Sequence, residues 1–264
     1  MEPRDWHPDP FRVLVTLGES TTAGGWSSTP DRCWAPLLAQ LISDFQDNPV
    51  TLINTGIGAN VISNRVPSYE KSGKPAANER LEKHVIAHDP DLLVVSYGLN
   101  DARAGTPVEM FRDELTQLLT DIRERCNPLI VLLGPYYMTA FSGYRAYEPY
   151  AHGSHEIFKI FNLATQQVAA ADDCLYCDVY NTYNEASWMV HDDAVHANDL
   201  GHRIIANEIF KVLAQHCSGL AVRTKQLEKT SDRWRDESVL KADYGHKTDE
   251  LPAPGQPAPP SRSG

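Results

Sequence analysis

The chain has 264 residues, 42% of them hydrophobic, which is enough for one sizeable core but leaves little room for a second full domain. Its formal net charge of −11 makes nucleic acid and anionic membrane surfaces poor partners, because both repel an acidic body. No run of about 18 apolar residues occurs, so we expect no membrane span, and the first residues lack the pattern of a signal peptide.

Five short apolar runs, rich in valine, leucine and isoleucine, alternate with amphipathic segments along the chain. They cover residues 12–17, 50–53, 92–97, 129–133 and 175–179. Near-continuous apolar content is typical of strands that are covered on both faces of a parallel sheet. The sequence therefore predicts a five-stranded, mainly parallel sheet.

The segments between these runs carry helix signals. Thr29 and Pro30 offer an N-cap and a first-turn proline, and Thr106 to Glu109 has the pattern of a capping box with proline at N1. Apolar residues recur at steps of three and four after both signals, and again from Ile157 and from Ile205. Alternation of strands and helices predicts right-handed crossovers and a three-layer α/β sandwich.

The alternating pattern decays after residue 217. We predict a single folded domain over residues 1–217, followed by a polar extension over residues 218–244. A short helix around Trp234 would pack either on the body or on a neighbouring subunit, and the second case would make a homo-oligomer. Residues 245–264 are rich in proline, which is typical of a disordered tail.

The five cysteines form an odd, scattered set, and we expect a reduced, cytoplasmic protein. Cys174 and Cys177 have the spacing of a redox motif. They lie at the start of an apolar run, however, whereas the redox motif opens a helix. We therefore interpret both as buried core thiols.

Polar residues gather where the predicted strands end, at the edge of the sheet on which the carboxyl ends of parallel strands converge. Three blocks follow the first three predicted strands, namely Gly18-Glu19-Ser20, Asn54 to Asn60 and Gly98-Leu99-Asn100-Asp101. The fourth block, Asp193-Ala194-Val195-His196, lies just before the last predicted helix. Each block alone has a structural explanation, since serine caps helices, Asn-Asp makes turns and glycine supplies positive φ. Together they contain a nucleophile, a base, a group to orient that base and oxyanion donors, which are the parts that acyl transfer needs.

The four blocks resemble those of the SGNH branch of the GDSL hydrolase superfamily, over about residues 12–213. The resemblance implies a flavodoxin-like SGNH hydrolase fold and an esterase that works through an acyl-enzyme, without a metal or an organic cofactor. It implies that Ser20 is the nucleophile, His196 the base and Asp193 the residue that orients it. The adjacent Asp192 does not have the family spacing. The oxyanion donors would be the Ser20 N–H, a second-block N–H and the Asn100 side-chain amide.

Two positions depart from the family pattern. Glu19 stands where the family name has aspartate, which leaves the packing of this turn open. The second-block donor, five residues beyond Asn54, is Ala59 rather than glycine, and a shift of one residue would make it Gly58. We favour Ala59, whose N–H remains a good donor if φ is negative.

We predict that the substrate is a small-molecule acyl ester. Thioesters and sugar acetates are alternatives within the family. An inactive ligand-binding protein of the same fold is a further alternative, which Glu19 and Ala59 favour, whereas a nucleotide-binding protein would need a phosphate-loop motif that is absent. Without a long apolar lid helix, short or water-soluble esters are favoured.

Aromatic residues after the fourth strand and near the last block are candidate substrate contacts. Tyr136, Tyr137 and Trp188 are our choices, with Met138 and Trp26 as further wall residues, and ordinary packing is the alternative for all five. Tyr144, Tyr147 and Tyr150 belong either to a lid or to an irregular loop.

Overall fold

The structure is a computed structural model and describes residues 4–142, 150–183 and 185–220. Nearly all of the predicted extension, with the helix around Trp234, and the whole predicted tail lie outside the described residues. Tyr144 and Tyr147 also lie outside them.

The described part of the chain contains one sheet of five parallel strands, in the order β2-β1-β3-β4-β5. The strands are β1 (Val13–Gly18), β2 (Thr51–Asn54), β3 (Leu92–Ser96), β4 (Leu129–Leu133) and β5 (Leu175–Cys177). β1 pairs with both β2 and β3, with Leu14 opposite Leu52 on one side and Leu92 on the other. The predicted strands and the parallel sheet are confirmed, with strand ends that differ by one or two residues.

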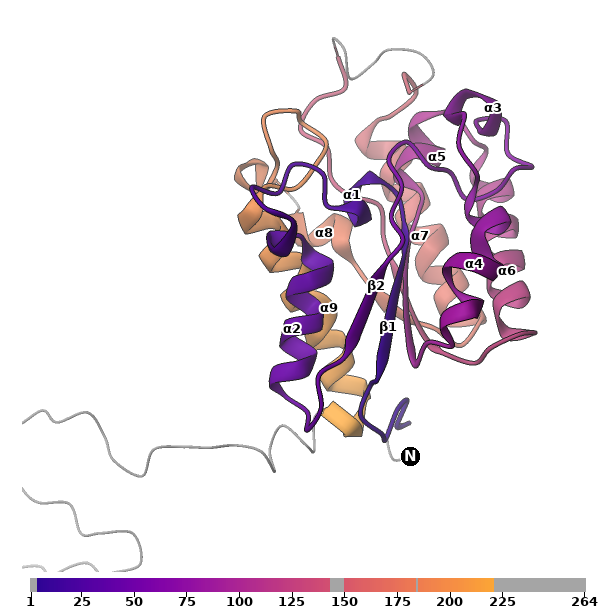
Figure 1. Cartoon of the computed structure of the whole chain (residues 1–264). Coiled ribbons are helices and arrows are strands. Elements are labelled where there is room, and N and C mark those ends of the chain that lie inside the picture. The colour runs from indigo at the N-terminus through magenta and orange to yellow at the C-terminus, as the bar shows by residue number, and fades with distance from the viewer. Residues whose placement is uncertain (1–3, 143–149, 184, 221–264) are drawn as a thin grey trace, which may run out of the picture. The chain divides into compact units, whose positions relative to one another are not determined.

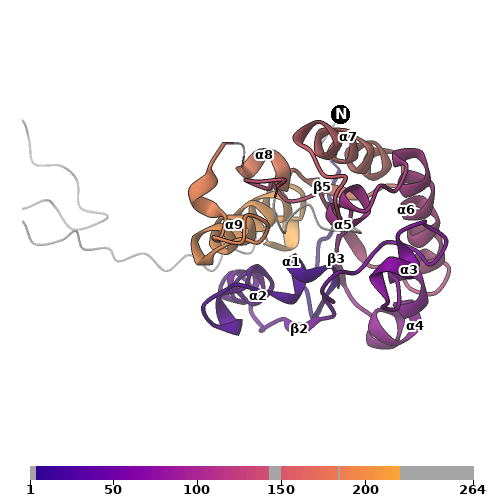
Figure 2. The same ribbon diagram turned by 90° about the horizontal axis from the view of Figure 1, so that it is seen from above.

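Helices cover both faces of the sheet, which confirms the three-layer sandwich (Figures 1 and 2). On one face α2 (Trp34–Asp44) packs against α9 (Asp199–His216), and on the other α6 (Val108–Arg123) packs against α7 (His155–Ala171). The short helices are α1 (Ser20–Ala23), α3 (Tyr69–Ser72), α4 (Leu81–His84), α5 (Leu99–Arg103) and α8 (Val179–Tyr183). In Figure 1, α1, α3 and α5 lie at the upper edge, beyond the carboxyl ends of the strands.

Two predicted helix starts are wrong in detail. Pro30 begins a 3₁₀ turn (Pro30–Arg32), and α2 starts later, at Trp34. Pro107 is the N-cap of α6 rather than its first helical residue, and the Thr106 hydroxyl lies 3.2 Å from the Ser68 hydroxyl instead of capping the helix. A proline has no N–H to donate, and the first turn of a helix tolerates this loss at several positions. A proline therefore predicts where a helix begins only to within one or two residues.

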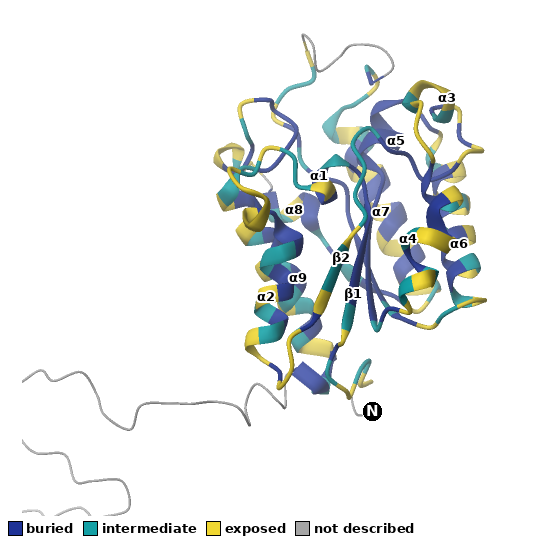
Figure 3. Cartoon of the chain, in the orientation of Figure 1, coloured by how far each residue is buried: buried dark blue, intermediate teal, exposed yellow. Residues whose placement is uncertain are grey.

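The central strands of the sheet consist almost entirely of buried residues (Figure 3). Every residue of β3 is buried, as are the last four residues of β4 and the last five of β1. Cys174 and Cys177 are buried free thiols, and burial raises their pKa to about 11 and about 12. Their interpretation as core thiols is confirmed.

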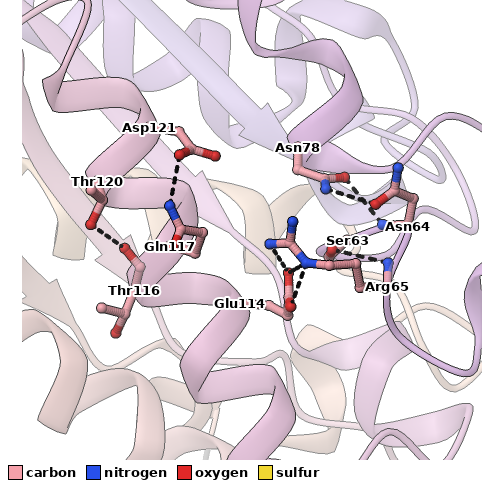
Figure 4. Close-up of polar contacts among 9 residues, drawn as sticks. All are labelled: Ser63, Asn64, Arg65, Asn78, Glu114, Thr116, Gln117, Thr120 and Asp121. Carbon is pink, nitrogen blue, oxygen red and sulfur yellow. Dashed lines mark hydrogen bonds and ion pairs between the residues drawn. The ribbon is translucent and has the colours of Figure 1, made fainter.

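The chain between β2 and α3 is joined to α6 by an ion pair between Arg65 and Glu114 (Figure 4). The Arg65 guanidinium donates to both carboxylate oxygens of Glu114, at 2.5 to 2.9 Å. This bidentate arrangement fixes the relative orientation of the two side chains. Asn64 and Asn78 also bond each other, at 2.9 and 3.1 Å. The chain that leaves the second block is thus attached to a long helix at Arg65.

Candidate active site

The candidate residues converge where the strand order reverses. β1 lies between β2 and β3, and the chain leaves β1 toward α2 on one face and leaves β3 toward α6 on the other. A crevice forms at such a switch point, outside the carboxyl ends of the two strands. Ser20, at the start of α1, and Asn100, in α5, follow these strands directly.

Ser20, His196 and Asp193 form a continuous chain of hydrogen-bonding groups. The His196 Nε2 lies 2.7 Å from the Ser20 Oγ, and its Nδ1 lies 2.5 Å from the Asp193 Oδ2. This is the relation between nucleophile, base and orienting carboxylate that nucleophilic acyl transfer requires. Sequence reasoning placed the three residues at one edge of the sheet, and the structure brings them together across 176 positions of sequence.

A tight turn presents His196. Val190 and Ala197 form an antiparallel bridge, and the His191 N–H donates to the His196 carbonyl at 2.8 Å. Ala194, between them, has a φ of 65°, the left-handed conformation that lets the chain reverse. The turn therefore aims the imidazole back toward Ser20.

Asp193 is fixed by its own turn as well as by the imidazole. Its Oδ1 accepts hydrogen bonds from the N–H groups of Val195 and His196, both at 3.0 Å. Burial alone would raise the pKa of Asp193, but the hydrogen bonds from His196 and from these N–H groups outweigh it, so the pKa is lowered. Asp193 therefore stays ionised and accepts from the Nδ1 side of the ring.

Glu19 joins the first block to the third. Its buried carboxyl group accepts from the Gly98 N–H at 3.1 Å and from the Asn100 N–H at 3.2 Å. Burial and the neighbouring Asp101 raise the pKa of Glu19 well above its ordinary value. The longer side chain thus fits the turn, because its carboxyl group reaches two backbone donors that would otherwise be buried without a partner.

Asp101 makes the corresponding connection to the second block. Its Oδ1 accepts from the Ile62 N–H at 3.2 Å, and burial raises the pKa of Asp101 to about 7. Through Glu19 and Asp101, the loops after β1, β2 and β3 are tied to one another by side-chain to backbone bonds.

Asn100 is buried beside the second block. Its side-chain Nδ2 donates to the Asn60 carbonyl at 3.2 Å, and the Arg103 Nη1 lies 3.5 Å from its Oδ1. An amide NH₂ has two hydrogens, so the bond to Asn60 leaves a second donor on the same nitrogen. Arg103, three residues along α5, was missed by sequence reasoning, although this spacing places both residues on one face of a helix.

Ala59 adopts a left-handed conformation with a φ of 55°, so the condition of a negative φ is not met. Its carbonyl accepts from the Ser72 hydroxyl at 2.6 Å and from the Tyr150 hydroxyl at 3.1 Å, which hold it in place. A Cβ at Gly58 would lie 3.8 Å from the Ser20 Cβ. Gly58 therefore lies beside Ser20 in space.

The family assignment follows from a comparison with known families. The model of the GDSL-like lipase/acylhydrolase family matches residues 16–204, which include all four blocks and most of the sheet. The chain belongs to this family. No curated protein matches its sequence.

Solved structures share the fold of this GDSL-family chain at low sequence identity. The lipase/acylhydrolase from Enterococcus faecalis is 21% identical, with a TM-score of 0.60, and the match covers 83% of this chain and 99% of that one. A variant of an acetyl xylan esterase from Geobacillus stearothermophilus is 18% identical, with a TM-score of 0.58 and coverages of 79% and 96%. A psychrotrophic esterase from a Pseudoalteromonas species is 18% identical, with a TM-score of 0.58 and coverages of 77% and 97%.

The predicted substrate contacts of this GDSL-family member lie in different environments. Tyr136 is 1% exposed and packs in the core against Tyr183, so its ring presents no surface to a substrate. Tyr137 is half-buried and stacks on His155, with ring centroids 4.5 Å apart. Trp188 is exposed, and its carbonyl accepts from the Asn198 side chain at 2.7 Å.

Trp26, among the predicted wall residues, contacts a residue of the candidate active site of this GDSL-family chain directly. Its indole stacks on the His196 imidazole with centroids 4.1 Å apart and an interplanar angle of 4°. Sequence reasoning named Trp26 only as a wall residue, because nothing in its spacing from His196 reveals a contact between two loops.

Among the residues that the structure describes, no group of three or more His, Cys, Asp or Glu side chains is placed to hold a metal ion. Likewise, none of the helices in these residues is long and apolar enough to cross a membrane.

Proposed function

We propose that this chain is a serine esterase of small acyl esters, with Ser20 as nucleophile, His196 as general base and Asp193 as the orienting carboxylate. The observation that carries the proposal is the hydrogen-bonded series from the Ser20 Oγ through both nitrogens of His196 to Asp193. Family membership supports the reaction class, since these are lipases and acylhydrolases. We propose residues 1–217 as the catalytic domain.

The mechanism uses groups of the chain itself. His196 takes the Ser20 proton on Nε2 while the Ser20 Oγ attacks the acyl carbonyl carbon, and then gives this proton to the departing alcohol. Water, activated by His196 in the same way, hydrolyses the acyl-enzyme. Asp193 holds the proton of the imidazole on Nδ1, and it stabilises the imidazolium that forms in each step.

The negative charge that develops on the carbonyl oxygen needs donors that are already in place. We assign the Asn100 Nδ2 and the Ser20 N–H to this role, with either the Ala59 N–H or the Gly58 N–H as the second-block donor, because the left-handed φ of Ala59 removes the reason for preferring it and Gly58 lies beside Ser20. Asn100 is held for it by Glu19 on its backbone and by Asn60 on its side chain.

A substrate panel tests the proposal and separates its alternatives. Purified chain would be assayed on p-nitrophenyl esters from acetate to palmitate, on an acyl thioester and on acetylated xylo-oligosaccharides. We expect the highest kcat/KM on short acyl esters, and a loss of about 10⁴-fold or more in Ser20→Ala. A chain that hydrolyses none of these compounds would be the inactive binding protein, and a Ser20→Ala variant with the parent's activity would contradict the role of Ser20.

The cytoplasmic location and a homo-oligomer formed through residues 218–244 remain predictions.

A further inference from the structure

The His196 imidazole is contacted on its face as well as at both nitrogens. Ser20 and Asp193 bind its Nε2 and Nδ1 in the plane of the ring, and Trp26 lies parallel to that plane. Contacts in the plane fix where the ring nitrogens point, whereas the stacked indole limits rotation of the ring out of the plane. The His196 side chain is 10% exposed in this arrangement.

The chain holds Trp26 in a backbone conformation that bulky residues rarely adopt. Its φ is 68°, in the left-handed region. The turn is closed by the Ser27 hydroxyl, which donates to the Gly24 carbonyl at 2.8 Å. Such a conformation persists only when the surroundings impose it, and it is common at functional sites.

The same segment is tied to the element that follows His196. The N–H and hydroxyl of Ser28 donate to the Asp199 carboxylate at 2.7 and 2.6 Å, and Arg32 forms an ion pair with it at 2.8 Å. Asp199 is the first residue of α9, three positions after His196. The segment between α1 and α2 therefore lies against the amino end of α9 (Figure 1). The bonds to Asp199 thus join the segment that carries Trp26 to the helix that follows His196.

Trp26 nevertheless remains 49% exposed. One face of the indole is covered by His196, and one edge meets His191 with centroids 6.4 Å apart. Most of the exposed surface must therefore belong to the opposite face and to the rim. An indole is also larger than an imidazole, so part of it extends beyond the ring that it covers.

The alcohol part of an ester comes closest to this surface. The bond between the tetrahedral carbon and the alcohol oxygen breaks as His196 gives the Nε2 proton to that oxygen, and the alcohol leaves neutral. The oxygen must therefore lie within hydrogen-bonding reach of Nε2, beside the rim of Trp26. A leaving group with a flat apolar face would be able to cover the exposed indole.

We propose that Trp26 is a positioning residue for His196 and that its exposed surface is the wall of a subsite for the leaving alcohol. The subsite takes alcohols with a flat apolar ring face, a property shared by aromatic rings and by pyranose sugars. This inference rests on the proposed function, because it assigns the leaving-group side of the same site.

The test compares three acetates of primary alcohols, so that the leaving-group chemistry stays similar: ethyl acetate, benzyl acetate and 6-O-acetylglucose. Wild type would be compared with Trp26→Ala, Trp26→Leu and Trp26→Phe. We expect Ala and Leu to lower kcat about 10-fold on all three esters, and Phe to restore it to within about 3-fold, because a second aromatic ring can stack on the imidazole. We also expect Trp26→Ala to lose a further 3- to 10-fold in kcat/KM, relative to its loss on ethyl acetate, on benzyl acetate or on 6-O-acetylglucose, whichever alcohol the subsite accepts.

Trp6→Ala is the matched control, since Trp6 packs against His216 at the far end of α9 and should not change the preference between these esters. Melting temperatures and near-UV circular dichroism of each Trp26 variant show that the fold is kept. Wild-type kcat in Trp26→Ala and in Trp26→Leu would overturn the positioning role. An equal loss on ethyl acetate and on both ring esters would overturn the subsite.

A binding measurement keeps this inference separate from the proposed function. In the Ser20→Ala chain, benzyl alcohol and glucose are titrated while tryptophan fluorescence is followed, and Ser20→Ala/Trp26→Phe is the blank. A saturable change that the blank lacks supports the subsite, and its absence with both alcohols overturns it. If instead Ser20→Ala hydrolyses esters at the parent rate, the proposed function fails, whatever the titration shows.

Discussion

The carboxyl group of Glu19, the residue before the proposed nucleophile Ser20, accepts a hydrogen bond at 3.2 Å from the backbone N–H of Asn100, the proposed oxyanion donor. The two residues follow β1 and β3, which pair side by side at the centre of the sheet. The glutamate that departs from the family name thus has a structural role in the site. It holds the start of α5 beside Ser20 through the N–H groups of Gly98 and Asn100.

Glu19→Ala should therefore lower both stability and activity. It would leave the buried N–H groups of Gly98 and Asn100 without this acceptor, at a cost of about 1–3 kcal/mol each. Glu19→Gln keeps a carbonyl oxygen as acceptor and should retain more of both. Urea unfolding and kcat on p-nitrophenyl acetate measure the two effects, and an alanine variant that matches wild type in both would contradict the link.

Asp101→Asn should change how stability depends on pH. The folded pKa of about 7 is raised by burial above the ordinary value of 3.8, so the folded state holds a proton that the unfolded chain releases. The stability linked to Asp101 is therefore fully present below about pH 4 and is lost as the pH rises through about 7. Asparagine stays neutral and can accept from Ile62, so we expect the variant to gain on the order of a few kcal/mol relative to wild type between pH 4 and pH 8.

Urea unfolding of both proteins at pH 4, 6 and 8 measures this change. Burial and Asp101 both raise the pKa of Glu19, so Asp101→Asn also changes how Glu19 titrates. Repeating the comparison in a Glu19→Gln background removes this second contribution. A difference between variant and wild type that is constant across this range would mean that Asp101 is ionised in the fold.

Asp193→Asn should cost far more activity than Asp192→Asn, because Asp193 supplies the carboxylate oxygen 2.5 Å from the imidazole. An amide neither stabilises the imidazolium nor fixes the tautomer in the same way, and losses on the order of 10³- to 10⁴-fold in kcat are typical. Steady-state kinetics on both variants give the ranking. If Asp192→Asn loses more, the orienting role belongs to the neighbouring residue.

The sheet, and the meeting of the proposed triad residues at one edge of it, were predictable because their signals are local or topological. Apolar runs mark buried strands, and parallel strands bring their carboxyl ends to one edge, so Ser20, Asn100 and His196 could be placed together before any contact was known. The contact between Trp26 and His196 joins two loops with no regular spacing, and only the folded chain reveals it. Tyr136 shows the same limit, since a residue that leaves a strand can turn into the core or out of it.

Ala59→Gly should keep its activity and should not destabilise the chain. The left-handed φ of 55° costs an alanine about 1–2 kcal/mol, while glycine adopts it freely and loses roughly 0.5–1 kcal/mol of chain entropy. The backbone N–H of residue 59, like that of Gly58, is present in both chains. Ala164→Gly, inside α7, is the control and should lose about 1 kcal/mol. Equal destabilisation in the two variants, or a tenfold loss of kcat in Ala59→Gly, would count against this account.

Asn100 provides the most direct test of the oxyanion hole. Asn100→Ala should lose roughly 10²- to 10³-fold in kcat, the size expected for one removed donor. Asn100→Asp should be at least as poor, because it puts a carboxylate where negative charge develops and opposite the Asn60 carbonyl. A residue that only shapes the turn after β3 would behave differently, since aspartate suits turns almost as well as asparagine. In that case the melting temperature would fall in Asn100→Ala while kcat stayed near wild type, and Asn100→Asp would be tolerated. Turnover and melting temperature measured on the same two variants decide between the roles, and full activity in Asn100→Asp would remove Asn100 from the mechanism.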